Sequence, residues 1–184
     1  MKNLLVVFLL IPLFCISQND FRKMNWGDSI NDLKEKYEDI SFSIEKVNDF
    51  IVYSHSDYVG GKDATVGYTF TNDKLFGAAY LFSTDSYKDS KERLRDFYSI
   101  SKRLNDKYNM DRNDQWLDET WKDDPDFLDL ALISGDVQLV ESGKNEGTLI
   151  MHTLGMTGGS LTHNLLYTSI ETVNSIQEEM DDDF

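Results

Sequence analysis

The stretch from Ser86 to Asn109 constrains the fold of this chain most, because it has the pattern of a long amphipathic helix. Its apolar and small residues recur three, four and seven positions apart, which places them on one stripe of a helix. Ser86 can cap the first turn together with Asp89, and Asn109 tolerates the left-handed conformation that ends many helices. The stripe consists of Tyr87, Leu94, Phe97, Tyr98, Ser101, Leu104 and Tyr108.

Strand patterns lie on both sides of this helix. A short helix over residues 29–37 precedes the first set of strands, which includes a tight hairpin at Asn72-Asp73. Residues 126–134 fit a short helix or a strand, and we favour the helix because Pro125 would open it and Gly135 would end it. The expected strands are 42–44, 50–53, 65–71 and 75–82, then 137–141, 148–154 and 161–170, with later turns at 143–145 and 157–159.

A helix followed by a strand meander therefore occurs twice. This order predicts an α+β fold, in which an antiparallel sheet carries helices packed on one face and the chain forms two α-β-β-β-like halves. We assign residues 18–171 to a single domain of this kind.

Three short motifs carry a resemblance to known proteins. They are Trp26-Gly27-Asp28-Ser29 before the first helix, Lys107-Tyr108-Asn109 at the end of the long helix, and Trp121-Lys122-Asp123-Asp124-Pro125. With these motifs the chain resembles uncharacterised secreted bacterial α+β proteins whose helix-plus-meander order is similar to the β-lactamase-inhibitor-protein type of fold. The resemblance implies an architecture and carries over no functional residue.

The first 17 residues have the pattern of a secretory signal peptide. A basic Lys2 precedes an apolar run from Leu4 to Phe14, and Cys15 and Ser17 suit the positions before a cleavage site. The run is shorter than the roughly 20 apolar residues of a membrane span, and no later segment approaches that length. We therefore expect a secreted or periplasmic protein without a transmembrane segment. The alternative is a lipid anchor on Cys15, which Phe14 disfavours because lipoprotein signals carry a small residue there.

The chain is strongly acidic, with a net charge of −15 at pH 7. This charge argues against binding to nucleic acid, because like charges repel. Residues 172–184 hold many acids and few apolar side chains, so we expect a disordered acidic tail. We expect a monomer.

Two histidines form a candidate metal site. His152 and His163 fall on strands joined by the turn at 157–159, and a two-residue turn at Thr157-Gly158 would place them directly opposite each other. Such a pair could share a transition metal. A register shift of one residue would separate them, and no third ligand is evident, so hydrogen-bonded strand histidines are the competing interpretation. We expect no cofactor.

The acid-rich segment 111–129 is a second candidate site. Its carboxylates could gather Ca²⁺, which takes about six to eight oxygen ligands, but their spacing does not match an EF-hand loop. Ordinary surface pairing with the basic side chains of the long helix is the competing interpretation. The acids are Asp111, Asp114, Asp118, Glu119, Asp123, Asp124, Asp126 and Asp129.

The same segment contains the predicted partner-binding residues, Trp116, Trp121, Asp118, Asp123 and Asp124. Two indoles provide apolar area to anchor a partner, and the acids would steer a basic one. The competing interpretation is that the indoles cover the edge of the sheet's core.

The sequence contains no recognisable catalytic motif. Its serines lack the G-x-S-x-G context, no cysteine follows residue 17, and no phosphate-binding glycine loop precedes a helix. We therefore expect a non-enzymatic binding or interaction module of the bacterial cell envelope, whose partner is an unknown envelope protein or glycan. An antiparallel sheet supports this because it leaves one face open. The alternative is a secreted calcium- or metal-binding protein that uses segment 111–129 or the histidine pair.

Overall fold

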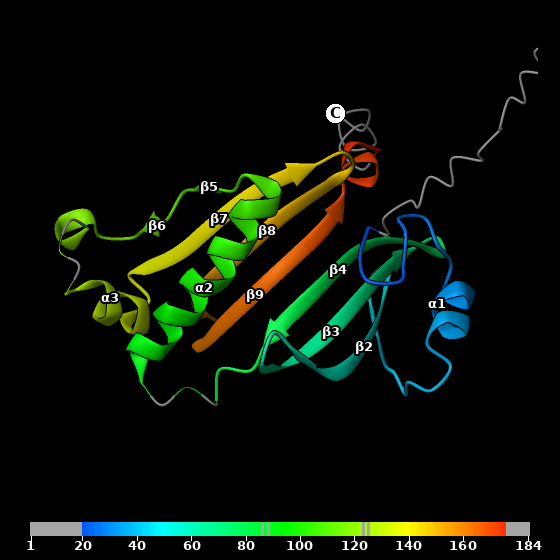
Figure 1. Cartoon of the computed structure of the whole chain (residues 1–184), viewed down its shortest axis with the longest axis horizontal. Coiled ribbons are helices and arrows are strands. Elements are labelled where there is room, and N and C mark those ends of the chain that lie inside the picture. The colour runs from blue at the N-terminus through cyan, green and yellow to red at the C-terminus, as the bar shows by residue number, and fades with distance from the viewer. Residues whose placement is uncertain (1–19, 86, 88, 123, 125, 176–184) are drawn as a thin grey trace, which may run out of the picture.

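A computed structural model describes residues 20–85, 87, 89–122, 124 and 126–175 (Figure 1). Its helices are α1 (Ile30–Lys36), α2 (Ser90–Tyr108), the 3₁₀ helix η1 (Glu119–Trp121) and α3 (Leu128–Ser134). Its strands are β1 (Ser43–Val47), β2 (Phe50–Val59), β3 (Lys62–Thr71), β4 (Lys74–Phe82), β5 (Asp111–Arg112), β6 (Gln115–Trp116), β7 (Val137–Asn145), β8 (Thr148–Thr157) and β9 (Ser160–Ser169).

The fold is of the α+β class and consists mostly of β-sheet. A nine-stranded antiparallel sheet has the order β1-β2-β3-β4-β9-β8-β7-β5, with β6 paired to β7. The first meander, β1 to β4, joins the second, β7 to β9, through the antiparallel pair β4–β9. The α+β class predicted from the sequence is confirmed.

Helix α2 matches the predicted long helix in its C-terminal end and differs at its start. Asn109 caps the C-terminus with a φ of 50°, as expected for an asparagine in the left-handed region. Asp89 caps the N-terminus, because its carboxylate accepts a hydrogen bond from the backbone N–H of Glu92. Tyr87 therefore precedes the helix instead of lying on its stripe, and Ser86 falls outside the described residues.

The two short helices lie within their predicted ranges, although α3 begins at Leu128, two residues later than predicted, with Phe127 as its N-cap. Ser29 and Asp32 build the capping box of α1, each side chain accepting from the other residue's backbone. Gly135 ends α3 with a φ of 85°, a conformation that glycine adopts without a steric cost.

Two of the predicted turns differ from the structure. Strand β7 continues through residues 143–145 and pairs Asn145 with Thr148, so that turn moves to Glu146-Gly147. The next turn is formed by Gly158 and Gly159, both at positive φ, and Thr157 pairs with Ser160. At the second turn, Thr157, Gly158 and Gly159 offered more than one two-residue turn, and strand pairing selected the two glycines.

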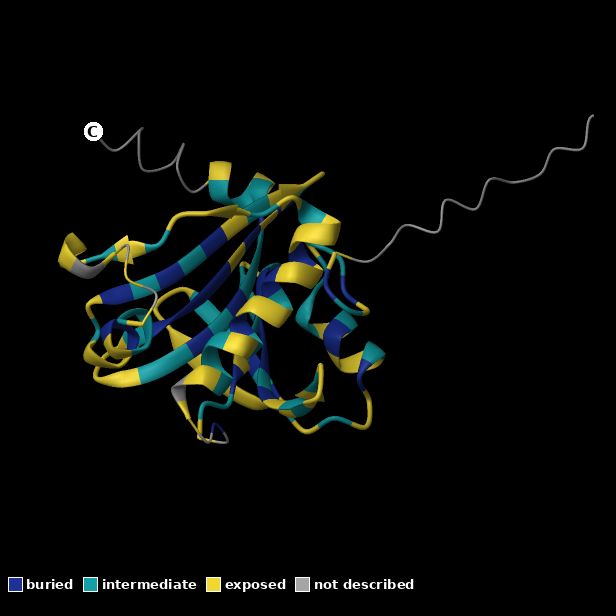
Figure 2. Ribbon diagram, turned by 60° about the vertical axis from the view of Figure 1, so that its left-hand side comes forward, coloured by how far each residue is buried: buried dark blue, intermediate teal, exposed yellow. Residues whose placement is uncertain are grey.

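The helices pack through buried side chains onto strand residues. Leu33 of α1 lies in a buried cluster with Tyr53, Val66, Tyr68 and Phe70 of β2 and β3. Phe97 of α2 and Leu132 of α3 share a second cluster with Leu139 of β7 and Leu154 of β8. Helix α2 consequently carries buried residues along one side and exposed residues along the other (Figure 2).

Several predictions concern the ends of the chain. The predicted signal peptide, residues 1–17, lies outside the described residues, as does most of the predicted acidic tail. Residues 170–175 are helical, and the Ser169 hydroxyl accepts the N–H of Thr172 at this turn. Within the part of the chain that the structure describes, no helix has the length and apolar character needed to cross a membrane.

Candidate functional site

Four side chains form a hydrogen-bonded chain buried between α2 and the sheet. The Tyr87 hydroxyl lies 2.8 Å from Nδ1 of His163, and Nε2 of His163 lies 2.9 Å from Nε2 of His152. Nδ1 of His152 lies 3.3 Å from Oε2 of Glu141. Both imidazoles are fully buried, and the Phe97 ring stacks on His152 with ring centroids 4.2 Å apart. We call these four residues the buried polar chain.

The register that brings the histidines together differs from the predicted one. His152 pairs with Leu165, and His163 pairs with Leu154, so the two histidines are diagonal neighbours instead of directly opposite. The prediction of direct pairing was wrong because the turn is Gly158-Gly159. The observed pairing of β8 with β9 differs from the predicted pairing by two residues. Because side chains alternate between the two faces of a strand, a shift of two residues keeps both histidines on the same face. The rings therefore still meet.

A single arrangement of protons satisfies every link of the buried polar chain. Tyr87 donates to Nδ1 of His163, His163 donates from Nε2 to Nε2 of His152, and His152 donates from Nδ1 to the Glu141 carboxylate. Each histidine is then neutral, with one N–H and one accepting nitrogen. Because buried polar groups without partners are costly, this arrangement makes a polar interior tolerable beneath α2.

The environment keeps both histidines neutral. Burial lowers the pKa of His163 to about 3, with the nearby His152 and Lys62 acting in the same direction. Burial also lowers the pKa of His152, although Glu141 partly opposes the shift. Burial alone would raise the pKa of Glu141, but its hydrogen bond with His152, together with the nearby Ser101 hydroxyl, lowers it below its ordinary value.

The geometry of these residues does not match a serine hydrolase triad. Ser101 Oγ lies 3.4 Å from Nδ1 of His152, the same nitrogen that faces Glu141. A triad needs the serine on one imidazole nitrogen and the acid on the other. Ser101 also donates to the carbonyl of Phe97 and is buried. Ser101 is therefore a packing residue of α2 and lacks the position of a nucleophile.

The histidine pair also lacks the surroundings of a metal centre. Nε2 of each ring is occupied by the other ring, and Nδ1 of each ring is occupied by Tyr87 or Glu141. Among the described residues no group of three or more histidine, cysteine or acidic side chains could hold a metal ion. Asp123 of the acidic segment falls outside those residues, and calcium binding by segment 111–129 stays a prediction.

The structure describes the side chains of three residues of the predicted partner surface, Trp116, Asp118 and Asp124. Trp116 lies in β6, pairs with Val137 and packs against the cluster around Phe97 and Leu132. Asp118 is exposed and caps η1, and its carboxylate accepts from the backbone of Thr120. Asp124 is exposed near the start of α3. Trp121 is the last residue of η1. Its side chain and the whole of Asp123 are not among the parts of the chain that the structure describes. A partner surface here stays a prediction.

Sequence reasoning missed the two outer members of the buried polar chain. Tyr87 was assigned to the apolar stripe of the long helix, and Glu141 to an ordinary strand position. A weak indication existed for Glu141, because it alternates with the apolar Val137 and Leu139 and therefore faces the core. A carboxylate on that face requires a buried partner.

Successive residues of a strand point to opposite faces of the sheet. The residues that alternate with those packed against the helices therefore form the other face of the sheet. We call them the outer face. Met151 pairs with Leu166, and Leu166 pairs with Ala79, so one continuous row crosses the middle of the sheet. The outer face consists of Phe50, Val52, Ser54, Ser56, Tyr58, Thr65, Gly67, Thr69, Gly77, Ala79, Leu81, Gln138, Val140, Ser142, Leu149, Met151, Thr153, Gly155, Thr162, Asn164, Leu166 and Thr168.

Every residue of the outer face is uncharged, in a chain of which 28% of residues are charged. Charged residues at outward positions lie at the rim, on the edge strands (Glu45 and Asp111) or at strand ends (Asp63, Lys74 and Lys144). Leu81, Leu149 and Met151 keep between 39% and 43% of their surface exposed. A solvated sheet face normally carries charged and strongly polar side chains, so this composition needs an explanation.

No protein-family model matches this chain, and comparisons with curated proteins and with solved structures found no significant match. The resemblance to the β-lactamase-inhibitor-protein type of fold therefore stays a prediction.

Proposed function

We propose that this protein is an exported, non-enzymatic interaction module that binds a partner protein through the outer face of its sheet. The observation that carries the proposal is the absence of charge from the outer face, in a chain with a net charge of −15. The centres of protein interfaces are depleted of charged residues, because each charge would have to be desolvated on binding. A face that only contacted water would have no such constraint.

The contacts of the helices support an open outer face. Leu33, Phe97 and Leu132 belong to three helices, and each packs on strand residues that alternate with those of the outer face. On this basis the helices form a layer on one side of the sheet and leave the other side free for a partner.

The chemistry of the outer face favours a protein partner. It combines exposed aliphatic side chains, such as Leu149 and Met151, with the hydroxyls of threonines such as Thr65 and Thr168. Its two aromatic residues, Phe50 and Tyr58, lie near opposite ends of β2, and three strands separate β2 from Met151 in β8. Carbohydrate sites commonly stack sugar rings on aromatic side chains, and the outer-face residues beside Met151 offer none. Methionine adapts to irregular partner surfaces because its side chain is flexible and polarizable. The partner surface should itself be uncharged and rich in aliphatic side chains.

Two further features support the absence of catalysis and the location outside the cytoplasm. The hydrogen-bonding groups of His152 and His163 are engaged with each other and with Tyr87 and Glu141, so the buried polar chain has no free catalytic group. The basic, apolar and small-residue pattern of residues 1–17 supports export, with lipidation of Cys15 as the alternative.

Site-specific photo-crosslinking in the producing cells tests the proposal. A benzophenone amino acid at Met151, in the middle of the outer face, should give an adduct with a discrete protein. The same group at Lys102, which is exposed on α2, should give none. A second variant carries the crosslinking amino acid at Leu149. Adding Met151→Glu to this variant should abolish the adduct and leave the thermal melting temperature nearly unchanged, because Met151 is exposed.

Three outcomes of the crosslinking itself would contradict the proposal. They are an adduct with a second copy of the chain, an adduct with glycan or lipid, and equal labelling from Met151 and Lys102. A discrete protein adduct that survives Met151→Glu would also place the partner elsewhere.

A further inference from the structure

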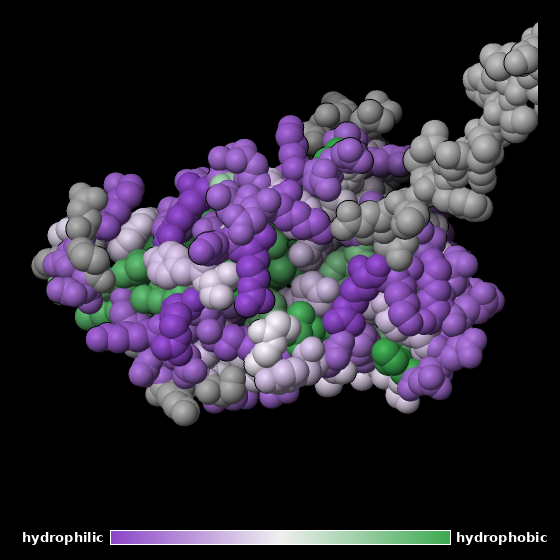
Figure 3. All heavy atoms as spheres, viewed as in Figure 1, coloured by the Kyte–Doolittle hydropathy of each residue, from purple (hydrophilic) through white to green (hydrophobic). Residues whose placement is uncertain are grey.

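A pocket of about 300 Å³ lies beside α2, on the side of the sheet opposite the outer face. Its floor is formed by Tyr80 and Phe82 of β4 and by Leu165 and Tyr167 of β9. One wall is the C-terminal half of α2, and the other is the turn between β2 and β3. Hydrophobic atoms appear between hydrophilic side chains where α2 faces β4 (Figure 3).

The position of the pocket follows from the spacing of residues on α2. Phe97, Ser101 and Leu104 face the sheet and are buried, whereas the neighbouring stripe that includes Ile100 and Arg103 points toward β4. Helix α1 packs on the distant β2–β3 part of the sheet, so it does not fill the space beside this stripe. The α2 stripe and the aromatic floor therefore line the same pocket from α2 and from the sheet.

The interior of the pocket is apolar and aromatic. Tyr80 and Tyr167 meet edge to face with ring centroids 6.1 Å apart, and Tyr80 stacks on Phe82 at 6.2 Å. Burial raises the pKa of Tyr167, and the nearby Tyr108 and Tyr80 add to the shift, so its phenol is neutral at physiological pH. Small-molecule sites commonly have this combination of apolar walls and a few polar groups.

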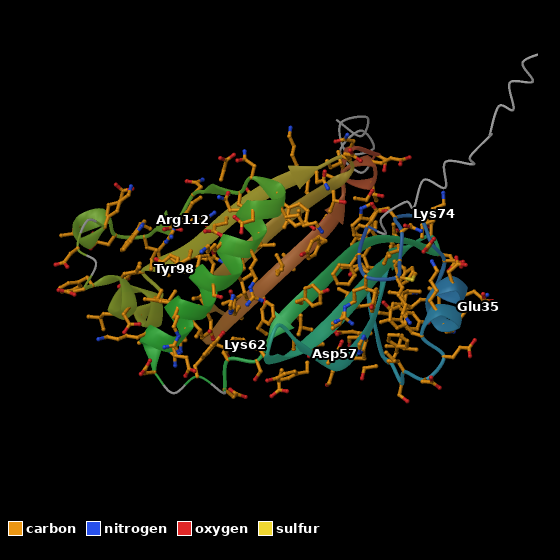
Figure 4. The ribbon with its side chains drawn as sticks, viewed as in Figure 1. Glu35, Asp57, Lys62, Lys74, Tyr98 and Arg112 are labelled. Atoms are coloured by element: carbon orange, nitrogen blue, oxygen red, sulfur yellow. The ribbon has the colours of Figure 1, made fainter. Side chains whose placement is uncertain are left out.

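The rim of the pocket is basic. It carries Lys62, Arg103 and Lys107 against one carboxylate, Asp96. Lys62 is paired with Asp96, and it lies beside α2 in Figure 4. Within the described residues neither Arg103 nor Lys107 takes part in an ion pair, although Lys107 lies over the Tyr108 ring. In a chain with a net charge of −15, two such cations at one opening are an unusual local excess.

We infer that this pocket binds a small amphipathic anion. Its apolar body would lie on Tyr80, Phe82 and Tyr167, and its anionic head would contact Arg103 and Lys107. A volume of about 300 Å³ suits a body of about ten non-hydrogen atoms, since one water molecule occupies roughly 30 Å³ of liquid. Acyl and aromatic carboxylates share this chemistry. The pocket and the outer face lie on opposite sides of the sheet, so this inference does not depend on the proposed function.

The test is an NMR titration of the purified, ¹⁵N-labelled protein with three probes of equal chain length: octanoate, octan-1-ol and octylammonium. Saturable shifts should be centred on Ile100, Arg103 and Tyr167. Octanoate should bind about tenfold more tightly than octan-1-ol, since a charge-assisted hydrogen bond contributes that much, and octylammonium should bind least. A parallel titration with 1-naphthoate distinguishes an aromatic from an acyl body.

Variants locate the anionic head and the apolar body separately. The double substitution Arg103→Gln and Lys107→Gln should weaken octanoate binding about tenfold and leave octan-1-ol unchanged. Lys102→Gln removes a cation from the same helix outside the pocket, and it is the matched control. Ser99→Phe, at an exposed position on the rim, should fill the opening and weaken both probes.

The inference is overturned if octanoate gives no saturable shifts, or if octanoate and octan-1-ol bind equally well. It is also overturned if Lys102→Gln weakens octanoate as much as the double substitution does, because binding would then follow overall charge instead of this pocket. A photo-crosslinked partner at Met151 would remain a separate result in each case.

Discussion

The Nε2 atoms of His152 and His163 lie 2.9 Å apart in a place that solvent does not reach. At this distance one nitrogen must donate and the other accept, so the contact exists only while the second ring keeps a lone pair. Tyr87 and Glu141 complete the chain at its two ends. The free energy of unfolding should therefore depend on pH through these two histidines, which lie beneath α2.

The first prediction concerns coupling within the buried polar chain. Tyr87→Phe should destabilise the protein by about 1–2 kcal/mol, because Nδ1 of His163 loses its donor. His163→Leu should cost about 2–4 kcal/mol, since both Tyr87 and His152 lose a partner.

The double variant should be less destabilised than the sum of the two by about 1 kcal/mol, as measured by urea unfolding. Tyr58→Phe is the control, because Tyr58 is 67% exposed. Strict additivity of Tyr87→Phe and His163→Leu would show that their hydrogen bond contributes nothing to stability.

The second prediction concerns acid. The pKa of His163 is lowered from 6.5 to about 3 in the folded protein, so the unfolded chain binds its proton first. The free energy of unfolding is then fully retained above pH 6.5 and decreases as the pH falls from 6.5 toward 3, by up to about 1.4 kcal/mol per pH unit for each histidine. The lowered pKa of His152 acts in the same direction.

Urea unfolding at several values between pH 7.5 and pH 5 measures this effect before most carboxylates titrate. His163→Leu should flatten the slope in this window even though it lowers stability at pH 7.5. A slope that is unchanged in His163→Leu would show that other groups cause the acid sensitivity.

The third prediction concerns the contact between α2 and the sheet. Phe97 is fully buried and stacks on His152, so Phe97→Ala should cost about 3–5 kcal/mol, and Phe97→Asp should prevent folding. Ser99→Ala, two positions away on the exposed side, should cost less than about 1 kcal/mol. Circular dichroism and thermal melting distinguish the outcomes. A wild-type melting temperature for Phe97→Asp would contradict the packing of α2 described above.

The fourth prediction compares two strand glycines. A Cβ on Gly155 would lie 2.8 Å from Cγ and 3.2 Å from Cα of Gln138, and the backbone atom cannot move away freely. Gly155→Ala should therefore destabilise the protein by about 1–3 kcal/mol. A Cβ on Gly67 would meet no atom within 4 Å, so Gly67→Ala should be neutral or slightly stabilising. Equal melting temperatures for the two variants would show that β7 and β8 separate more easily than this contact implies.

Local patterns in the sequence determined much of the fold. The capping box at Ser29, the ending of α2 at Asn109, the hairpin at Asn72-Asp73 and the ending of α3 at Gly135 depend on residues within one turn of each other. Alternation along the strands predicted which residues share a face, and this is why His152 and His163 were expected near each other. These features need no knowledge of distant contacts.

The tertiary structure decided everything that depends on which strands pair and in what register. Two adjacent glycines at 158 and 159 made Gly158-Gly159 available as the turn, and this choice shifted the pairing of β8 and β9 by two residues. Tyr87 lies before the helix and not on its stripe, because Asp89 caps α2. In this position its hydroxyl contacts His163. The uncharged outer face and the basic rim at Arg103 became visible only when strands and helices from both halves were placed together. Periodicity is a property of neighbouring residues, whereas register and enclosure depend on the free energy of contacts between segments far apart in the chain.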